Sequence, residues 1–328
     1  MGVYHFMGLG RSVGTVTTAV SYLAARYQRY NHADARFFAL SGEVGQAGKR
    51  GDAQALILFT TLEVREGKPN GLCLEYKDNP LGQRYGTSKK DEPMSQALKA
   101  LLSDELSVLV GGRSTIEIYW CDVNRVDLEV TFERVSRVLL AAKPPQEVGK
   151  EVWVNLTGGS NVVNMALQLA TTLSGKPSRL YYLQADDISL ARPALRPENI
   201  GTSGDRFWVE LPIIYLAFDT THRAILEELQ TLPAPITEDD LLSRLKGGGH
   251  WQAFQAIDVQ AFRRTYLIPL RAQQLLQWQG HSLQIGQRWN TFRQYYSVMT
   301  GLTAKEPETL AELSQREAWF HDETYPLR

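Results

Sequence analysis

The sequence predicts an α/β fold in which a doubly wound, mostly parallel sheet is followed by a mainly helical domain. Three observations support this prediction. Apolar runs alternate with segments of helical periodicity through the first two thirds of the chain. Two of these runs end in glycine-rich turns that open helices. After residue 216 the alternation gives way to helical segments. We therefore expect domains at residues 1–216 and 217–328.

Short apolar runs bounded by turn residues predict the strands of the first domain. They cover residues 3–8, 35–40, 55–61, 115–122, 151–156, 179–184 and 207–216. Apolar residues three or four positions apart predict helices at 15–27, 95–109, 128–142 and 161–174. The runs at 152–156 and 180–183 suit central strands that are buried on both faces. Pro212 places the last run at an edge or exit of the sheet, since proline donates no ladder hydrogen bond.

The second domain is predicted to contain several helices and a small wing. Helices are expected at 222–232, at 237–245 after the capping residue Thr237, and at 259–279, where Pro269 should kink or split the helix. The alternating stretch 281–286 is interpreted as a two-stranded wing, and the tail from 291 begins as a helix. Helix, helix, helix and wing is the order of a winged helix-turn-helix.

Composition excludes several classes of protein. The 328 residues carry a formal net charge of −1, so no global field attracts nucleic acid or a membrane, and anion recognition must be local. No apolar run approaches the roughly 20 residues of a membrane span. Two cysteines argue against a disulfide framework and indicate a cytoplasmic protein. The six histidines show no metal-ligand spacing, so we expect neither a metal nor a cofactor.

The first glycine-rich loop has the pattern Gly8-x-Gly10-x-x-x-Gly14. It is one residue too long for the dinucleotide fingerprint and lacks the lysine of a Walker loop. Its free backbone N–H groups and the helix that follows suit a phosphate. The alternative is a strand-to-helix turn that binds nothing and leaves Arg11 in solvent.

The second loop, Leu156-Thr-Gly-Gly-Ser-Asn161, is more specific. With the first loop it resembles the CARF domains, which are Rossmann-fold sensors associated with CRISPR systems. The resemblance covers roughly residues 1–216. It implies a cyclic oligoadenylate ligand, with the cyclic tetra-adenylate as first choice, bound between the subunits of a homodimer in type III CRISPR defence. A winged helix after a CARF domain is a familiar arrangement among transcription factors and ring nucleases of this family.

The resemblance implies roles for the loop residues. Catalytic roles fall on four residues, Arg11, Ser12, Ser160 and Asn161. The ligand-binding residues would be Gly8, Leu9, Gly10, Thr15, Thr157, Gly158, Gly159 and Asn164, with Lys49 and Arg50 from a neighbouring glycine-rich loop. Ring cleavage would use the ribose 2′-OH as nucleophile and need no metal. Several ring nucleases carry a lysine after the second loop's glycines, where this chain has Ser160 and Asn161.

Three alternative functions remain open. The protein could be a regulator that senses the messenger without cleaving it and grips DNA phosphates through Arg263, Arg264, Arg271 and Arg288, although winged helices also serve as dimerisation modules. A nicotinamide-dependent enzyme is disfavoured by the loop spacing. Arg316 and His321 have the spacing of HEPN ribonucleases, but the segment after the wing is too short for that helical bundle.

Overall fold

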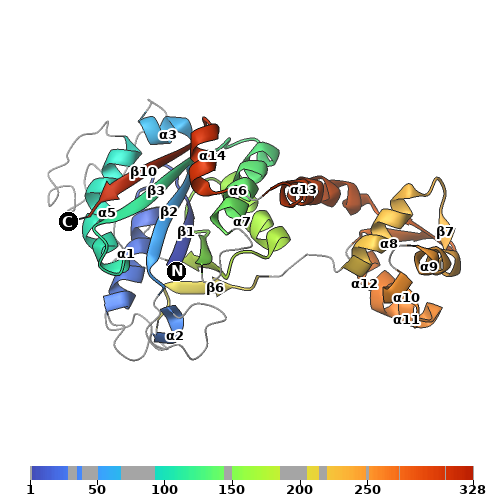
Figure 1. The fold of residues 1–328 in the computed structure, drawn as a ribbon. Coiled ribbons are helices and arrows are strands. Elements are labelled where there is room, and N and C mark those ends of the chain that lie inside the picture. The colour runs from blue at the N-terminus through green and yellow to red at the C-terminus, as the bar shows by residue number, and fades with distance from the viewer. Residues whose placement is uncertain are drawn as a thin grey trace. The chain divides into compact units, whose positions relative to one another are not determined.

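The computed structural model describes residues 2–28, 35–38, 51–67, 93–143, 150–184, 205–213, 220–248, 251–272, 274–306 and 308–327. The chain forms two compact units (Figure 1). Unit 1 comprises Met1–Tyr215 together with Leu302–Arg328, and unit 2 comprises Leu216–Gly301.

Unit 1 is built on a seven-stranded sheet with the order β10-β3-β2-β1-β4-β5-β6. Its strands are β1 (Gly2–Gly8), β2 (Ala53–Thr60), β3 (Thr115–Asp122), β4 (Lys150–Asn155), β5 (Arg179–Leu183), β6 (Trp208–Leu211) and β10 (Phe320–Pro326). The five inner strands are parallel, and the two edge strands are antiparallel to their neighbours. The predicted α/β class with a mostly parallel sheet is therefore confirmed, as is the edge position of the strand before Pro212.

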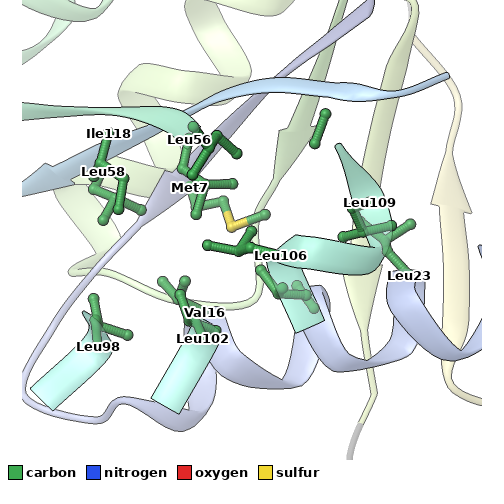
Figure 2. Packing of buried hydrophobic residues seen from close by; sticks show 14 of the residues in the cluster. Met7, Val16, Leu23, Leu56, Leu58, Leu98, Leu102, Leu106, Leu109 and Ile118 are labelled. Atoms are coloured by element: carbon green, nitrogen blue, oxygen red, sulfur yellow. The ribbon is translucent and has the colours of Figure 1, made fainter. Parts of the chain in front are cut away.

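Helices cover both faces of this sheet. They are α1 (Gly14–Gln28), α2 (Ala35–Phe38), α3 (Leu62–Glu66), α5 (Met94–Leu109), α6 (Leu128–Ala142), α7 (Asn161–Ser174) and α14 (Leu310–Arg316). Figure 1 shows α1 and α5 on one face, with α6 and α7 on the other. The leucines of α5 recur every three or four residues and so form one stripe. Figure 2 shows this stripe, Leu98, Leu102, Leu106 and Leu109, packed with Met7, Val16, Leu23, Leu56, Leu58 and Ile118.

The chain reverses its direction across the sheet next to β1. Strands β1, β2 and β3 progress towards one edge, and the chain then returns to place β4 on the other side of β1. Because β1 and β4 are parallel and paired, with Met7 opposite Asn155, the loops that follow them lie at the same edge. Ligands of doubly wound sheets bind outside the carboxyl ends of strands at such a switch point.

Unit 2 contains a three-stranded sheet of order β7-β9-β8 among short helices. Its elements are α8 (Thr220–Thr231), β7 (Ile236–Thr237), α9 (Glu238–Gly247), α10 (Trp251–Phe254), α11 (Val259–Phe262), a π-helical turn (Arg263–Leu267), α12 (Ile268–Ala272), β8 (Leu276–Gln279), β9 (Ser282–Ile285) and most of α13 (Gln287–Thr303). Thr237 caps α9 as predicted, since its Oγ1 accepts from the backbone N–H of Asp240 at 3.2 Å. The winged-helix assignment of this unit stays a prediction.

Two predictions of secondary structure were wrong. The run 35–40 was predicted as a strand, but Ala35–Phe38 is helical, and residues 39 and 40 lie outside the described residues. Phe37 lies under the guanidinium of Arg26, 3.5 Å from the ring centroid, and packs edge-on against Trp153. Tertiary packing therefore decided the secondary structure of this short apolar run, because its periodicity fits a strand and a helix equally well.

The predicted helix at 259–279 ends at Ala272 instead. A π-helical turn precedes Pro269, and residues 276–279 form β8. Proline offers no N–H to the carbonyl four residues before it, which favours an irregular helix at this point. Gly280, at φ 63°, turns β8 back onto β9, so the wing begins earlier than predicted.

The tail returns to unit 1, although the sequence placed it with the second domain. Strand β10 pairs with β3, with Phe320 opposite Cys121. Phe320 is fully buried and stacks on Tyr119 with a centroid distance of 5.3 Å. No described helix is long and apolar enough to cross a bilayer.

Replacing Phe320 by alanine should lower the free energy of unfolding by about 3–5 kcal/mol, because it opens a cavity between β10 and β3. Chemical denaturation of the full chain measures this change. The matched control is Asp322→Ala in the same strand, whose exposed side chain predicts a change within about 0.5 kcal/mol. Equal losses in the two variants would contradict the placement of β10.

Candidate functional site

The two glycine-rich loops contact each other directly at the switch point. A Cβ atom on Gly8 would lie 2.3 Å from the carbonyl oxygen of Gly158, and one on Gly158 would lie 2.2 Å from the Cβ of Thr15. Gly159 has φ 94°, which side-chain-bearing residues rarely adopt. These three glycines are therefore required for the loops to meet, whether or not a ligand binds.

Hydrogen bonds hold the second loop in place. The Asn155 Oδ1 accepts from the backbone N–H of Thr157 at 2.7 Å, and the Thr157 Oγ1 accepts from the N–H of Leu183 at 2.8 Å. Ser160 is the N-cap of α7, and its Oγ accepts from the N–H of Val163 at 3.3 Å. The loop thus delivers the chain into α7 with the amino end of the helix at the edge of the sheet.

The first loop is anchored at both ends and open in the middle. The backbone N–H of Leu9 donates to the carbonyl of Phe59 at 2.9 Å, and the Thr15 hydroxyl donates to the carbonyl of Ser12 at 2.9 Å. Between these anchors, a Cβ on Gly10 would meet no atom within 4 Å. Gly10 therefore faces open space, unlike the glycines at the contact.

A pocket of about 270 Å³ opens where the two loops meet. Residues that follow four parallel strands, β1 to β4, line it: Leu9, Gly10, Arg11, Thr61, Glu63, Val64, Arg125, Gly159, Ser160 and Val163. We call it the loop pocket. It brings together five residues that the sequence predicted for the site, Leu9, Gly10, Arg11, Gly159 and Ser160.

Arg125 is a pocket residue that the sequence analysis missed. It stands in the turn between β3 and α6, where the Asn124 Oδ1 accepts from the N–H groups of Val126 and Asp127 at 3.0 and 3.3 Å. Within the described part of the chain, its guanidinium makes no hydrogen bond or ion pair. The signal for Arg125, and for Thr61 and Glu63, was their position just after the predicted strands 115–122 and 55–61.

Other predicted residues lie behind the pocket or beside it. Thr15 and Thr157 are almost fully buried, and both hydroxyls are used in the internal hydrogen bonds given above, which assigns them a structural role. Asn161 is exposed at the start of α7, and the buried Oδ1 of Asn164 has no hydrogen-bond partner among the residues that the structure describes. Gly8, Ser12 and Gly158 do not line the pocket. Lys49 and Arg50 lie outside the described residues.

The chemistry of the loop pocket favours an anion. Two guanidinium groups, those of Arg11 and Arg125, face a single carboxylate, Glu63. The amino end of α7 adds a partial positive charge, because the first N–H groups of a helix have no partner within the helix. In the described residues, no group of three or more His, Cys, Asp or Glu side chains is placed to hold a metal ion. The pocket can therefore grip a phosphate through guanidinium, hydroxyl and backbone N–H donors.

Arg316 and His321, which have the spacing of HEPN ribonucleases, do not form a common site. Arg316 lies in α14 and forms ion pairs with Glu308 and Glu317. His321 lies in β10, where its Nε2 is 3.4 Å from the Oδ2 of Asp122. Because Arg316 and His321 each interact with different carboxylates, they do not form a nuclease site together.

The four arginines proposed for DNA contact divide into two pairs. Arg263 is 3.3 Å from the Glu238 carboxylate, and both Arg263 and Arg271 lie near the ring of Trp278, at 5.8 and 5.1 Å from its centroid. Arg264 and Arg288 are exposed and form no ion pair with any residue that the structure describes. The first pair stabilises unit 2, and the second is available to a partner.

Comparison with known proteins shows similarity to a curated relative and, more distantly, to solved structures. No family model matches the chain. An uncharacterized protein of Archaeoglobus fulgidus is 30% identical over 231 residues, which are 66% of this chain and 70% of that protein. Among solved structures, Enterococcus italicus Csm6 bound to cyclic hexa-2′-fluoro-hexa-dAMP matches 83% of this chain and 56% of its own, at 11% identity and a TM-score of 0.39. Can2 from Sulfobacillus thermosulfidooxidans, in complex with cyclic tetra-adenylate, matches 92% of this chain and 65% of its own, at 11% identity and a TM-score of 0.27. TM-scores this low do not establish a shared fold.

Gly158→Ala should lower the free energy of unfolding by about 1–3 kcal/mol, because its methyl group would collide with Thr15 and push the loops apart. Gly10→Ala is the matched control in the partner loop, where the added methyl meets open space. Chemical denaturation compares the two variants. Similar stabilities would contradict the close contact between the loops.

Proposed function

We propose that this chain, which belongs to the same family as the uncharacterized protein of Archaeoglobus fulgidus, binds a cyclic oligoadenylate in its loop pocket. The observation that carries the proposal is the convergence of both glycine-rich loops and two arginines on one hollow at the switch point. The same two loops carry the resemblance to CARF domains. Cyclic tetra-adenylate is the first ligand to test.

A phosphodiester of the ring suits the donors of the loop pocket. Arg11 and Arg125 supply charge-assisted hydrogen bonds to the non-bridging oxygens. The Ser160 hydroxyl already accepts a hydrogen bond from Val163, but its own proton is not used by that bond and can donate to the phosphate. Uncharged glycines let the phosphate approach the backbone closely.

The size of the loop pocket supports a homodimer. Its volume of about 270 Å³ lies below the ~300–1,000 Å³ that encloses a complete small ligand. One pocket therefore holds one nucleotide of the ring. Leu62 and Val126, next in sequence to pocket residues, expose 36% and 80% of their surface. A second copy related by two-fold symmetry would cover them and present its own pocket to the opposite side of the ring.

Cleavage of the bound ring is the second part of the proposal. The ribose 2′-oxygen attacks the adjacent phosphorus, the bond from phosphorus to the 5′-oxygen breaks, and the products are a 2′,3′-cyclic phosphate and a 5′-hydroxyl. Alignment of these three atoms can contribute about 7–11 kcal/mol. Of the four residues expected to act in cleavage, Arg11 and Ser160 line the loop pocket and would stabilise the charge that develops on the phosphate, at about 3–4 kcal/mol for each well-placed donor.

Binding is tested by calorimetric titration of the full chain with cyclic tetra-adenylate. Arg125→Gln should weaken binding about tenfold, which is ~1.4 kcal/mol, through loss of one charge-assisted contact. Arg293→Gln, at an exposed arginine of α13 in unit 2 that does not line the loop pocket, should leave the affinity unchanged. Absence of binding to the wild-type chain by the cyclic tri-, tetra- and hexa-adenylates would overturn the proposal.

Cleavage is tested by incubating the ring with excess protein in the presence of EDTA. We expect linear products that end in a 2′,3′-cyclic phosphate, because the proposed chemistry uses no metal. An intact ring after hours, with binding retained, would leave a sensor without ring-nuclease activity.

A regulator that binds DNA through unit 2 is the second candidate. The exposed pair Arg264 and Arg288 and the exposed Ile268 on the same helical segment as Arg264 favour it. Arg264→Gln combined with Arg288→Gln should reduce the slope of log affinity against log salt by about 2. Arg244→Gln is the control, because this guanidinium is held by Glu228 at 2.6 Å. An unchanged slope in the double variant would exclude this surface.

A further inference from the structure

A second hollow in unit 1 lies far from the loop pocket. Its volume is about 360 Å³. It is lined by the carboxyl-terminal half of α6, by Lys176 just after α7, and by Leu302, Thr303, Lys305, Glu306, Glu308 and Arg316. Ser160 at the start of α7 lines the loop pocket, whereas Lys176 follows the other end. Since α7 spans 14 residues, the two hollows are separated by roughly 21 Å, at about 1.5 Å per residue.

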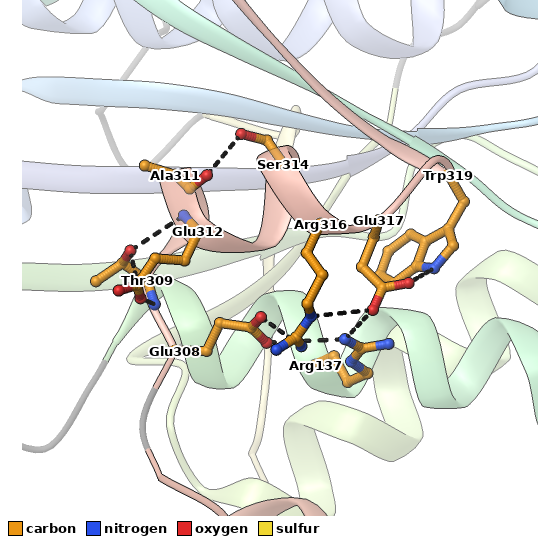
Figure 3. A network of polar contacts seen from close by, with 9 residues as sticks. All are labelled: Arg137, Glu308, Thr309, Ala311, Glu312, Ser314, Arg316, Glu317 and Trp319. Carbon is orange, nitrogen blue, oxygen red and sulfur yellow. Dashed lines mark hydrogen bonds and ion pairs between the residues drawn. The ribbon is translucent and has the colours of Figure 1, made fainter.

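One wall of this hollow is a closed network of ion pairs (Figure 3). The Arg137 Nη2 is 2.6 Å from the Glu317 carboxylate and 3.8 Å from that of Glu308. Arg316 reaches the same two carboxylates. Two arginines and two glutamates thus balance one another. The wall is fixed, and its charges are already satisfied.

Three lysines on the remaining rim are not balanced in this way. The amines of Lys143, Lys176 and Lys305 form no ion pair with any carboxylate in the described part of the chain, and Lys143 Nζ donates only to the backbone carbonyl of Lys176 at 3.1 Å. Burial lowers the pKa of Lys143, and Lys176 lowers it further, against an opposing effect of Glu151. The carboxyl ends of α6 and α7 offset part of this charge, and Glu306 is the remaining acidic residue of the lining.

The hollow also has an apolar part. Leu140, Ala141 and Leu302 are among its lining residues. A hollow that combines apolar lining residues with convergent charged groups and a titratable group of shifted pKa is a candidate ligand site. Its volume lies in the ~300–1,000 Å³ range of complete small-molecule pockets.

We propose that this hollow, the lysine pocket, is a second ligand site that binds a small organic phosphate. The phosphate lies against the amines of Lys143, Lys176 and Lys305, which bind phosphate as point charges. The organic part lies on Leu140, Ala141 and Leu302. This proposal is independent of the function proposed for the loop pocket, since the two hollows share no residue.

The test uses adenosine 5′-monophosphate as the probe in calorimetric titrations of the full chain, with adenosine and inorganic phosphate as partial probes. The monophosphate should bind more tightly than either part. Lys143→Met combined with Lys176→Met should weaken it about tenfold or more, through loss of two charge-assisted contacts. Lys305→Met should also weaken binding of the monophosphate. Because Lys305 is exposed, this substitution should not disturb the fold.

Two controls make the result specific. Lys246→Met removes a lysine of similar exposure from α9 and should not change the affinity. Arg125→Gln removes a guanidinium group from the loop pocket, so a loss of affinity in this variant would show that the monophosphate binds there. Absence of binding by the wild-type chain, or loss of binding in Arg125→Gln with retention in the lysine variants, would overturn the lysine pocket. Thermal unfolding of each variant separates loss of binding from loss of the fold.

Discussion

The contact between Gly8 and Gly158 is the constraint on which the site depends. Their backbones lie so close that a single methyl group on either would overlap the partner loop or Thr15. This approach is possible because β1 and β4 are adjacent and parallel, so that the loops after both strands begin at the same edge of the sheet. The contact directs β1 into α1 and β4 into α7, and it leaves Gly10, Arg11 and Ser160 facing the hollow between them.

This arrangement separates two uses of glycine that a sequence pattern cannot distinguish. Gly8, Gly158 and Gly159 allow the loops to pack, whereas Gly10 faces open space. The hydroxyl residues of the two loops also have different roles. Thr15 and Thr157 hold the loops from beneath, while Ser160 both caps α7 and lines the hollow. Binding chemistry therefore lies on a smaller set of residues than the glycine-rich pattern contains.

Helix α7 connects two regions of different electrostatic character. At its amino end, the partial positive charge of the helix and the guanidinium groups of Arg11 and Arg125 attract an anion. Beyond its carboxyl end, Lys176 joins Lys143 in a hollow that Leu140, Ala141 and Leu302 also line. Arginines also line this second hollow, but Arg137 and Arg316 are neutralised by Glu308 and Glu317 (Figure 3). In the second hollow the proposed ligand contact falls on lysines that form no ion pair with any carboxylate of the described chain.

The sequence by itself determined the alternation of strands and helices, the buried strand β4 and the two loops, because periodicity and glycine placement are local properties. The prediction that 180–183 is buried on both faces was wrong, since Tyr182 of β5 is 38% exposed. It also placed five of the ten residues of the loop pocket, since those five follow two strands directly. Only the tertiary structure decided that Arg125, Thr61 and Glu63 join them, because strand order brings four strand ends to one edge. It likewise decided that Ala35–Phe38 is a helix under Arg26 and that Phe320 carries the tail back to β3. The lining of the loop pocket, the helix at 35–38 and the position of the tail all depend on contacts between residues distant in sequence. A local sequence pattern does not encode such contacts.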